Sequence, residues 1–168
     1  MKFFVKPLIV LFVLAASCND SNKVESNPIS SSQPGIEKIK LMSLEGLPIE
    51  MRQYKGKAVF INFWATWCKP CLEEMPAIRK AMDLLKDEKI EFLFASDEAT
   101  EEIHAFEEEH RYRLYYVRPG NIEDLNIIGL PTTFIFDQNG KQVFSEMGYR
   151  KWDDKVNIDL LLKIANPK

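Results

Sequence analysis

The stretch Trp67-Cys68-Lys69-Pro70-Cys71 follows a nearly continuous apolar run, residues 58–64, and precedes a segment whose apolar residues recur with helical spacing. A strand that gives way to a helix at this point would place Cys68 at the helix N-terminus. Unpaired backbone N–H groups and the helix dipole favour a thiolate there. Cys71 lies one helical turn further on, close enough to displace a mixed disulfide formed by Cys68. The spacing therefore predicts a redox-active dithiol.

Composition and charge limit what else the chain does. It has 168 residues, of which 46% are hydrophobic, which is enough for one globular domain with an ordinary core. Three cysteines are too few for a disulfide framework, and two of them form the CxxC pair. The net charge of −3 and the lack of a basic stripe argue against nucleic acid as a partner. A protein or small-molecule partner is expected instead.

The N-terminal residues have the features of a targeting segment. In residues 1–17, Lys2 and Lys6 accompany an apolar run that is too short to span a bilayer, and small residues precede Cys18. Small residues followed directly by cysteine resemble the bacterial lipoprotein signal, which implies cleavage before Cys18 and lipid attachment to it. An ordinary cleaved signal peptide, or an uncleaved anchor, is the alternative. The Ser/Asn-rich residues 18–35 are then expected to form a flexible tether.

Residues 36–168 alternate between strand and helix patterns. We expect short strands within residues 36–54, buried strands over 57–64 and 90–95, and a further strand over 114–117. Helices are expected over 71–87, with a kink at Pro76, over 99–111 on the surface and over 152–165 at the end, with a helical turn over 122–127. Strands 132–136 and 142–144 should form a hairpin around Asn139-Gly140. This order predicts an α/β domain, a central mixed β-sheet with helices on both sides and an N-terminal β extension.

Residues 62–71, then Glu74 and Pro76, and later residues 129–134 resemble, in order and in type, the thioredoxin-fold proteins. More narrowly, they are similar to the TlpA/ResA-type extracytoplasmic thiol-disulfide oxidoreductases. The resemblance covers residues 36–165 and implies the thioredoxin fold. It also implies that the Leu130-Pro131 peptide is cis, faces the dithiol and offers its backbone to an extended substrate segment. The small free-energy difference between cis and trans X-Pro bonds makes this admissible.

Glu74 is the candidate for proton transfer. It lies three residues after Cys71, hence on the same helical face, and the family carries a functional acid at this position. A partly buried carboxyl group would have a raised pKa and could relay a proton to or from the Cys71 thiol. The alternative is a solvated first-turn glutamate. Thioredoxin itself has a buried acid at the strand position that is Asn62 here, and this departure makes Glu74 the better candidate.

Three residues beside the cysteines are expected to contact substrate. Trp67 is interpreted as a lid beside the disulfide and part of the docking surface, although plain packing is the alternative. Lys69 is an exposed cation that favours the Cys68 thiolate modestly. Pro70 fits the first helical turn, where its missing N–H has no helical partner to lose.

Other uses of a CxxC pair fit the sequence poorly. A zinc site would need further ligands, and only His104 and His110 could supply nitrogen, so no metal is predicted. A c-type haem attachment site needs histidine where Leu72 stands. The peroxiredoxin pattern needs proline and threonine where Ile61 and Ala65 stand, so peroxidase activity is not expected.

The sequence thus predicts a lipid-anchored protein of the bacterial cell envelope, on the periplasmic side, that reduces disulfides in extracytoplasmic proteins without a cofactor. A membrane thiol-disulfide donor would supply its electrons, and the resemblance includes roles in cytochrome c maturation and envelope redox homeostasis. Whether the dithiol reduces or oxidises its substrates depends on its reduction potential relative to that of its donor. A disulfide oxidase or isomerase stays open, as does a non-enzymatic anchored module in which Cys68 and Cys71 form a static disulfide.

Overall fold

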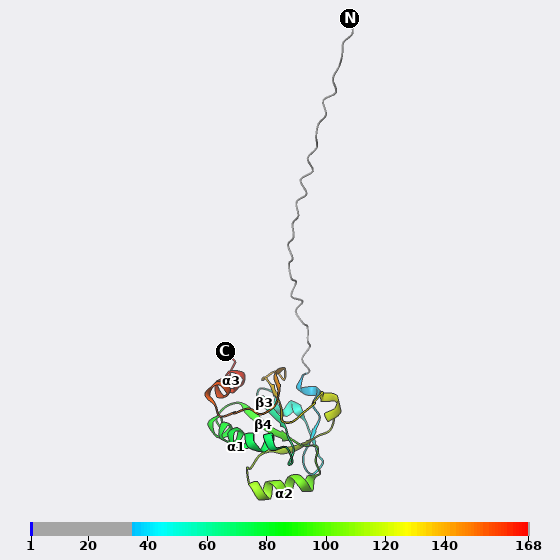
Figure 1. Ribbon diagram of the computed structural model, residues 1–168, viewed down its shortest axis with the longest axis vertical. Coiled ribbons are helices and arrows are strands. Elements are labelled where there is room, and N and C mark those ends of the chain that lie inside the picture. The colour runs from blue at the N-terminus through cyan, green and yellow to red at the C-terminus, as the bar shows by residue number, and fades with distance from the viewer. Residues whose placement is uncertain (2–34, 168) are drawn as a thin grey trace. The chain divides into compact units, whose positions relative to one another are not determined.

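The computed structural model describes Met1 and residues 35–167, which include one seven-stranded mixed sheet with the strand order β2-β1-β5-β4-β3-β6-β7 (Figure 1). The centre is β3 (Ala58–Phe63), whose six residues are all buried. It runs parallel to β4 (Ile90–Ala95) and antiparallel to β6 (Thr132–Phe136). A strand covered on both faces reads as a continuous apolar run, which is why the segment before the cysteines takes this place.

The two edges of the sheet are antiparallel. On one side β5 (Tyr116–Pro119) pairs with β1 (Leu41–Met42), which pairs with β2 (Pro48–Ile49) and forms the expected N-terminal extension. On the other side β6 and β7 (Gln142–Met147) form the expected hairpin. Asp137 closes that hairpin, because its Oδ1 accepts the N–H groups of Asn139 at 2.8 Å and Lys141 at 3.0 Å.

The three α-helices found in residues 35–167 cover one face of the sheet. Side chains of α1 (Lys69–Leu84), α2 (Thr100–His110) and α3 (Lys155–Ala165) join a single apolar cluster on that face. In the strand order, β4 lies next to β3 and β5 lies next to β4, so the chain moves across the sheet in the same direction at both connections. Because both crossovers are right-handed, the two connecting helices, α1 and α2, lie on the same side of the sheet. A second cluster on the opposite face is covered by the short 3₁₀ helices η1 (Ile36–Lys38), η2 (Met51–Tyr54) and η3 (Ile122–Leu125). Helices lie on both faces, as expected, but of different kinds.

Several boundaries differ from the sequence-based expectations. α1 continues through Pro76, which is exposed, and ends at Leu84 rather than near Asp87. The strand expected over 114–117 lies at 116–119, because Arg111 and Arg113 adopt left-handed backbone angles after α2 and delay it. Trp152 precedes α3 instead of opening it, and its side chain is buried in the core.

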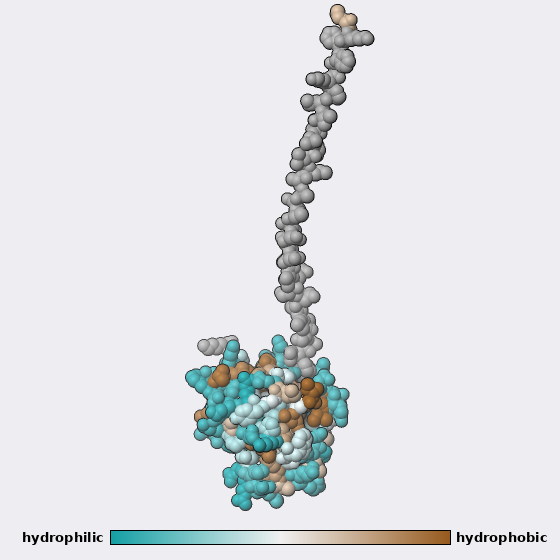
Figure 2. Space-filling model, in the orientation of Figure 1, coloured by the Kyte–Doolittle hydropathy of each residue, from teal (hydrophilic) through white to brown (hydrophobic). Residues whose placement is uncertain are grey.

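The face of the domain shown in Figure 2 is mostly hydrophilic, with separate apolar patches. No helix within the described residues combines the length and the apolar character needed to cross a membrane. The predicted signal peptide, the tether and Cys18 lie outside the described residues.

Candidate active site

Cys68 and Cys71 form a disulfide at the start of α1, with an S–S distance of 2.00 Å and a Cα–Cα distance of 5.3 Å. Cys68 is the N-cap residue of the helix, and its carbonyl accepts the N–H groups of Cys71 at 2.9 Å and Leu72 at 3.1 Å. The expected strand-to-helix position of Cys68 is therefore confirmed. Both cysteines are buried, but Cys68 retains 4% exposure whereas Cys71 has none.

The residues around Cys68 face solvent. Trp67 is 74% exposed, Lys69 and Pro70 are exposed, and the Lys69 ammonium lies 3.9 Å from the Glu73 carboxylate. Trp64, three residues before Trp67, is 1% exposed and packs against Phe106 and Tyr116. Plain core packing is thus the role of Trp64, and it does not explain Trp67.

The Leu130-Pro131 peptide is cis, as the resemblance implied. Pro131 is buried, and its carbonyl accepts the Gly148 N–H at 2.7 Å. Leu130 and Trp67 both line a cleft of about 250 Å³, whose other walls include Ile127, Ile128 and Asp97. The fold therefore brings the proline loop to the same cleft as the residue before Cys68, although 62 positions separate Trp67 and Gly129 in the sequence.

Glu74 is completely buried, which rules out the solvated alternative, whereas its neighbour Glu73 is exposed. The Glu74 Oε1 accepts the Asn62 Nδ2–H at 2.7 Å, and Oε2 accepts the backbone N–H of Arg150 at 3.1 Å. Burial raises the pKa of Glu74 from 4.5 to about 7, while the hydrogen bonds from Arg150 and Asn62 oppose this shift. The Trp152 indole contributes less and in the same direction as these bonds, although its N–H lies outside hydrogen-bonding geometry.

Asn62 links Glu74 to the proline loop. Its Nδ2 also donates to Thr133 Oγ1 at 3.1 Å, and Thr133 lies two residues after Pro131. Asn62 and Thr133 are opposite each other in the β3–β6 pairing, so the sheet register sets this contact. Asn62 Oδ1 is buried and has no hydrogen-bond partner among the described residues.

Two contributors to the site were missed by the sequence analysis. The Glu98 carboxylate accepts the Thr66 N–H at 2.7 Å, the Thr66 hydroxyl at 2.6 Å and the Ser96 hydroxyl at 2.9 Å, and so fixes the loop before Cys68. A signal for it existed, since Glu98 follows β4 as Thr66 follows β3, and the carboxyl ends of adjacent parallel strands meet at one edge. Arg150 had no such signal, because it contributes a backbone N–H.

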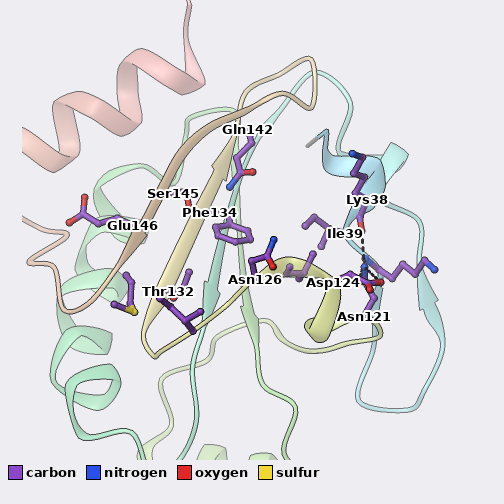
Figure 3. Close-up of a pocket in the computed structure, with 14 residues that line it drawn as sticks. Lys38, Ile39, Asn121, Asp124, Asn126, Thr132, Phe134, Gln142, Ser145 and Glu146 are labelled. Atoms are coloured by element: carbon purple, nitrogen blue, oxygen red, sulfur yellow. Dashed lines mark hydrogen bonds between the residues drawn. The ribbon is translucent and has the colours of Figure 1, made fainter. Parts of the chain in front are cut away.

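A second cavity lies apart from the disulfide. It measures about 560 Å³ and is bounded by Lys38 to Lys40, the η3 region and the β6–β7 hairpin (Figure 3). Asn121 on its wall is already engaged, since its side chain bonds Lys38 O and Lys40 N, each at 3.0 Å. None of the sequence-predicted site residues between 67 and 131, all of which the structure describes, lines this cavity.

The histidines take no part in the dithiol site. His104 and His110 are exposed on α2. Within the part of the chain that the structure describes, no three His, Cys, Asp or Glu side chains are grouped so that they could hold a metal ion.

Comparison with known proteins agrees with this geometry. The AhpC/TSA family matches residues 35–145. The chain is 30% identical to the thiol-disulfide oxidoreductase ResA of Bacillus cereus over 170 residues, 95% of each chain, and 36% identical to ResA of Bacillus thuringiensis subsp. konkukian over 128 residues, 74% of this chain and 72% of that one.

Among solved structures, the thioredoxin domain of a thiol-disulfide oxidoreductase from Bacteroides vulgatus superimposes with a TM-score of 0.65 at 24% identity, covering 81% of this chain and 96% of that one. This likeness confirms the thioredoxin fold. The sequence relatives carry the assignment further, because they cover 95% and 74% of the chain and are named for the chemistry that a CxxC disulfide at a helix N-terminus performs. The chain belongs to the AhpC/TSA family and is a ResA-like thiol-disulfide oxidoreductase.

Proposed function

We propose that this protein reduces disulfides in extracytoplasmic proteins, with Cys68 as the attacking thiolate and Cys71 as the resolving thiol. The observation that carries the assignment is the asymmetry of the pair: Cys68 caps the helix, follows the exposed Trp67 and retains 4% exposure, whereas Cys71 lies inside the first turn and has none. Cys68, the less buried residue of the pair, is therefore assigned the attack on the substrate disulfide.

The reaction has two exchange steps. The Cys68 thiolate attacks one substrate sulfur, so that the substrate S–S bond breaks, a mixed disulfide forms and one substrate thiolate leaves. The Cys71 thiol then loses its proton and attacks the Cys68 sulfur, which releases the second substrate thiolate and closes the Cys68–Cys71 disulfide. Two electrons pass from the dithiol to the substrate, and the two protons lost by the cysteines balance the two that the substrate thiolates take up.

Glu74 is assigned the proton transfer at Cys71. The two residues lie one turn apart on α1 and are both completely buried, so water reaches neither directly. With a pKa of about 7, Glu74 is partly ionised near neutral pH and can accept the Cys71 proton in one direction or return it in the other. Nothing comparable is available from Glu73, which is exposed and pairs with Lys69.

Substrate docking is assigned to the exposed surface around Cys68 and to the proline loop. Trp67, Lys69 and Pro70 are the exposed neighbours of Cys68, and Leu130, which directly precedes Pro131, lines the adjoining cleft. An extended peptide that carries the disulfide could lie between these two segments.

Trapping tests the two cysteine roles. Cys71→Ser should accumulate a covalent mixed disulfide through Cys68 with a protein disulfide such as that of insulin, visible on a non-reducing gel, because the resolving thiol is gone. The matched variant Cys68→Ser should accumulate none. Equal trapping by both variants would contradict the assigned order of attack.

The reducing direction needs a donor that returns the disulfide to the dithiol, and we assign this role to a membrane thiol-disulfide protein. A redox titration of the pair against glutathione measures its potential, and a strongly oxidising value would replace the reductase assignment with an oxidase or isomerase. A Cys68–Cys71 bond that resists dithiothreitol would instead favour the non-enzymatic anchored module.

Membrane attachment through Cys18 is the remaining part of the proposal, together with removal of residues 1–17, a tether over residues 18–35 and a folded domain over 36–168. The sequence pattern before Cys18 supports it. The mass of the intact protein from membranes should show acyl chains on an N-terminal Cys18, and an unmodified mass would remove the lipid anchor.

A further inference from the structure

The loop between β7 and α3 reaches the buried acid with its main chain. The Arg150 backbone N–H donates to Glu74 Oε2 at 3.1 Å, across 76 positions of sequence. The other oxygen of Glu74 is held by Asn62 on β3. The loop contact differs from the strand contact, because a loop keeps a backbone N–H in place only where other bonds fix the loop.

Asn157 supplies those bonds from the first turns of α3. It is 4% exposed, its Oδ1 accepts the Arg150 Nε–H at 2.8 Å, and its Nδ2 donates to the Lys151 carbonyl at 2.7 Å. One side chain thus holds the side chain of Arg150 and the carbonyl of the next residue. A buried amide that bonds two consecutive loop residues fixes the path of the main chain between them.

The Arg150 side chain is held at its far end as well. Its guanidinium lies 5.1 Å from the Phe144 ring centroid and 5.5 Å from that of Trp152, and Nη1 contacts Glu146 at 2.5 Å. The Glu146 carboxylate is 49% exposed, so the stacking and the Asn157 bond are the buried part of this arrangement.

The groups that act on Glu74 come from β3 and from the loop between β7 and α3. β3 contributes the neutral Asn62 amide, with Thr133 of β6 behind it, and the loop contributes the Arg150 N–H and the Trp152 indole. The guanidinium charge of Arg150 is directed to Asn157 and Glu146. The loop therefore acts on the acid through a fixed dipole, whose effect depends on position.

We infer that Asn157 and the Arg150 side chain are positioning residues for Glu74: together they hold the Arg150 N–H against the carboxylate and so couple α3 to the proton transfer at the dithiol. Their mechanistic meaning rests on the proposed role of Glu74, but the coupling itself is a property of the carboxylate and is measured without reference to thiol chemistry.

The test is the titration of the Glu74 carboxyl carbon by NMR in the full chain, with ¹³C-labelled glutamate and the disulfide intact. Asn157→Ala frees the loop, so the Arg150 N–H is no longer held against the Glu74 carboxylate. Because this donor stabilises the anion, its loss should raise the titration midpoint of Glu74 by about one pH unit, a tenfold change in the dissociation constant. Arg150→Lys, which keeps the backbone N–H and loses the Nε donor, should move it in the same direction. Arg150→Lys also keeps the test decisive if Asn157→Ala fails to fold.

Two variants serve as controls. Glu146→Gln removes only the exposed contact of Arg150, and Val156→Ala changes the 69% exposed neighbour of Asn157 on α3; both should leave the midpoint within about 0.3 units of the wild-type value. An unchanged midpoint in folded Asn157→Ala and Arg150→Lys proteins would overturn the inference. Failure of the Glu74 role is a separate result: Glu74→Gln would then leave the pH profile of Cys71 alkylation unchanged, whatever the carboxyl midpoint does.

Discussion

Two glutamates hold the chain on either side of the disulfide, and their surroundings differ. Glu98 is partly exposed and accepts three hydrogen bonds, two of them from Thr66 in the loop before Cys68. Glu74, after Cys71, has no exposure and accepts two N–H groups. A carboxylate that accepts three hydrogen bonds is suited to holding a loop in place. A carboxylate that burial makes harder to ionise is suited to exchanging protons.

The largest expected change in unfolding free energy comes from neutralising the buried glutamate, Glu74. Because the Glu74 pKa is raised from 4.5 to about 7, the unfolded chain releases its proton first, and stability falls as pH rises through that window. The shift corresponds to about 3 kcal/mol of unfolding free energy, present below pH 4.5 and lost above pH 7. Glu74→Gln should therefore gain up to this amount relative to wild type between pH 4.5 and pH 8, measured by urea unfolding.

The exposed neighbour provides the control for that measurement. Glu73→Gln removes a carboxylate one position away that is 57% exposed, so its unfolding curve should follow the wild type at every pH. If Glu74→Gln also parallels the wild type across the range, the buried carboxyl does not carry the raised pKa.

A smaller change in stability is expected from substituting the partly exposed Glu98. Glu98→Ala removes the acceptor of three hydrogen bonds, and in a partly exposed site this should lower the unfolding free energy by about 1–2 kcal/mol. Glu98→Gln keeps one acceptor oxygen, so its unfolding free energy should lie between those of the wild type and Glu98→Ala. The exposed Glu101 on α2 is the matched comparison, and an equal loss from Glu101→Ala would show that the contact with Thr66 contributes nothing specific.

The smallest change in stability is expected at Trp67. With 74% of its surface exposed, Trp67→Ala should alter the unfolding free energy by less than about 0.5 kcal/mol. Its effect should appear in substrate docking, as a rise in KM for a protein disulfide that is absent for a small disulfide such as oxidised glutathione. Equal losses for both substrates would assign Trp67 to the chemistry rather than to docking.

Much of this arrangement could be read from the sequence, because it depends on local patterns. The apolar run before the cysteines predicts β3, the helical spacing after them predicts α1, and the interval from Cys71 to Glu74 predicts a shared helical face. The Arg150 contact depends on the path of a loop after β7, and its donor is a backbone N–H that every residue except proline carries. Glu98 lies between these cases, since the strand pattern predicts its neighbourhood but not its partner Thr66.

The position of Pro76 inside α1 has a consequence for the turn that carries the disulfide. Proline has no N–H to donate to the carbonyl four residues earlier, so the Leu72 carbonyl lacks its helical partner. The turn from Lys69 to Leu72 is thus joined to the rest of the helix by one hydrogen bond fewer than a regular helix would provide, so the backbone that carries both sulfurs is held less tightly than the turns that follow it.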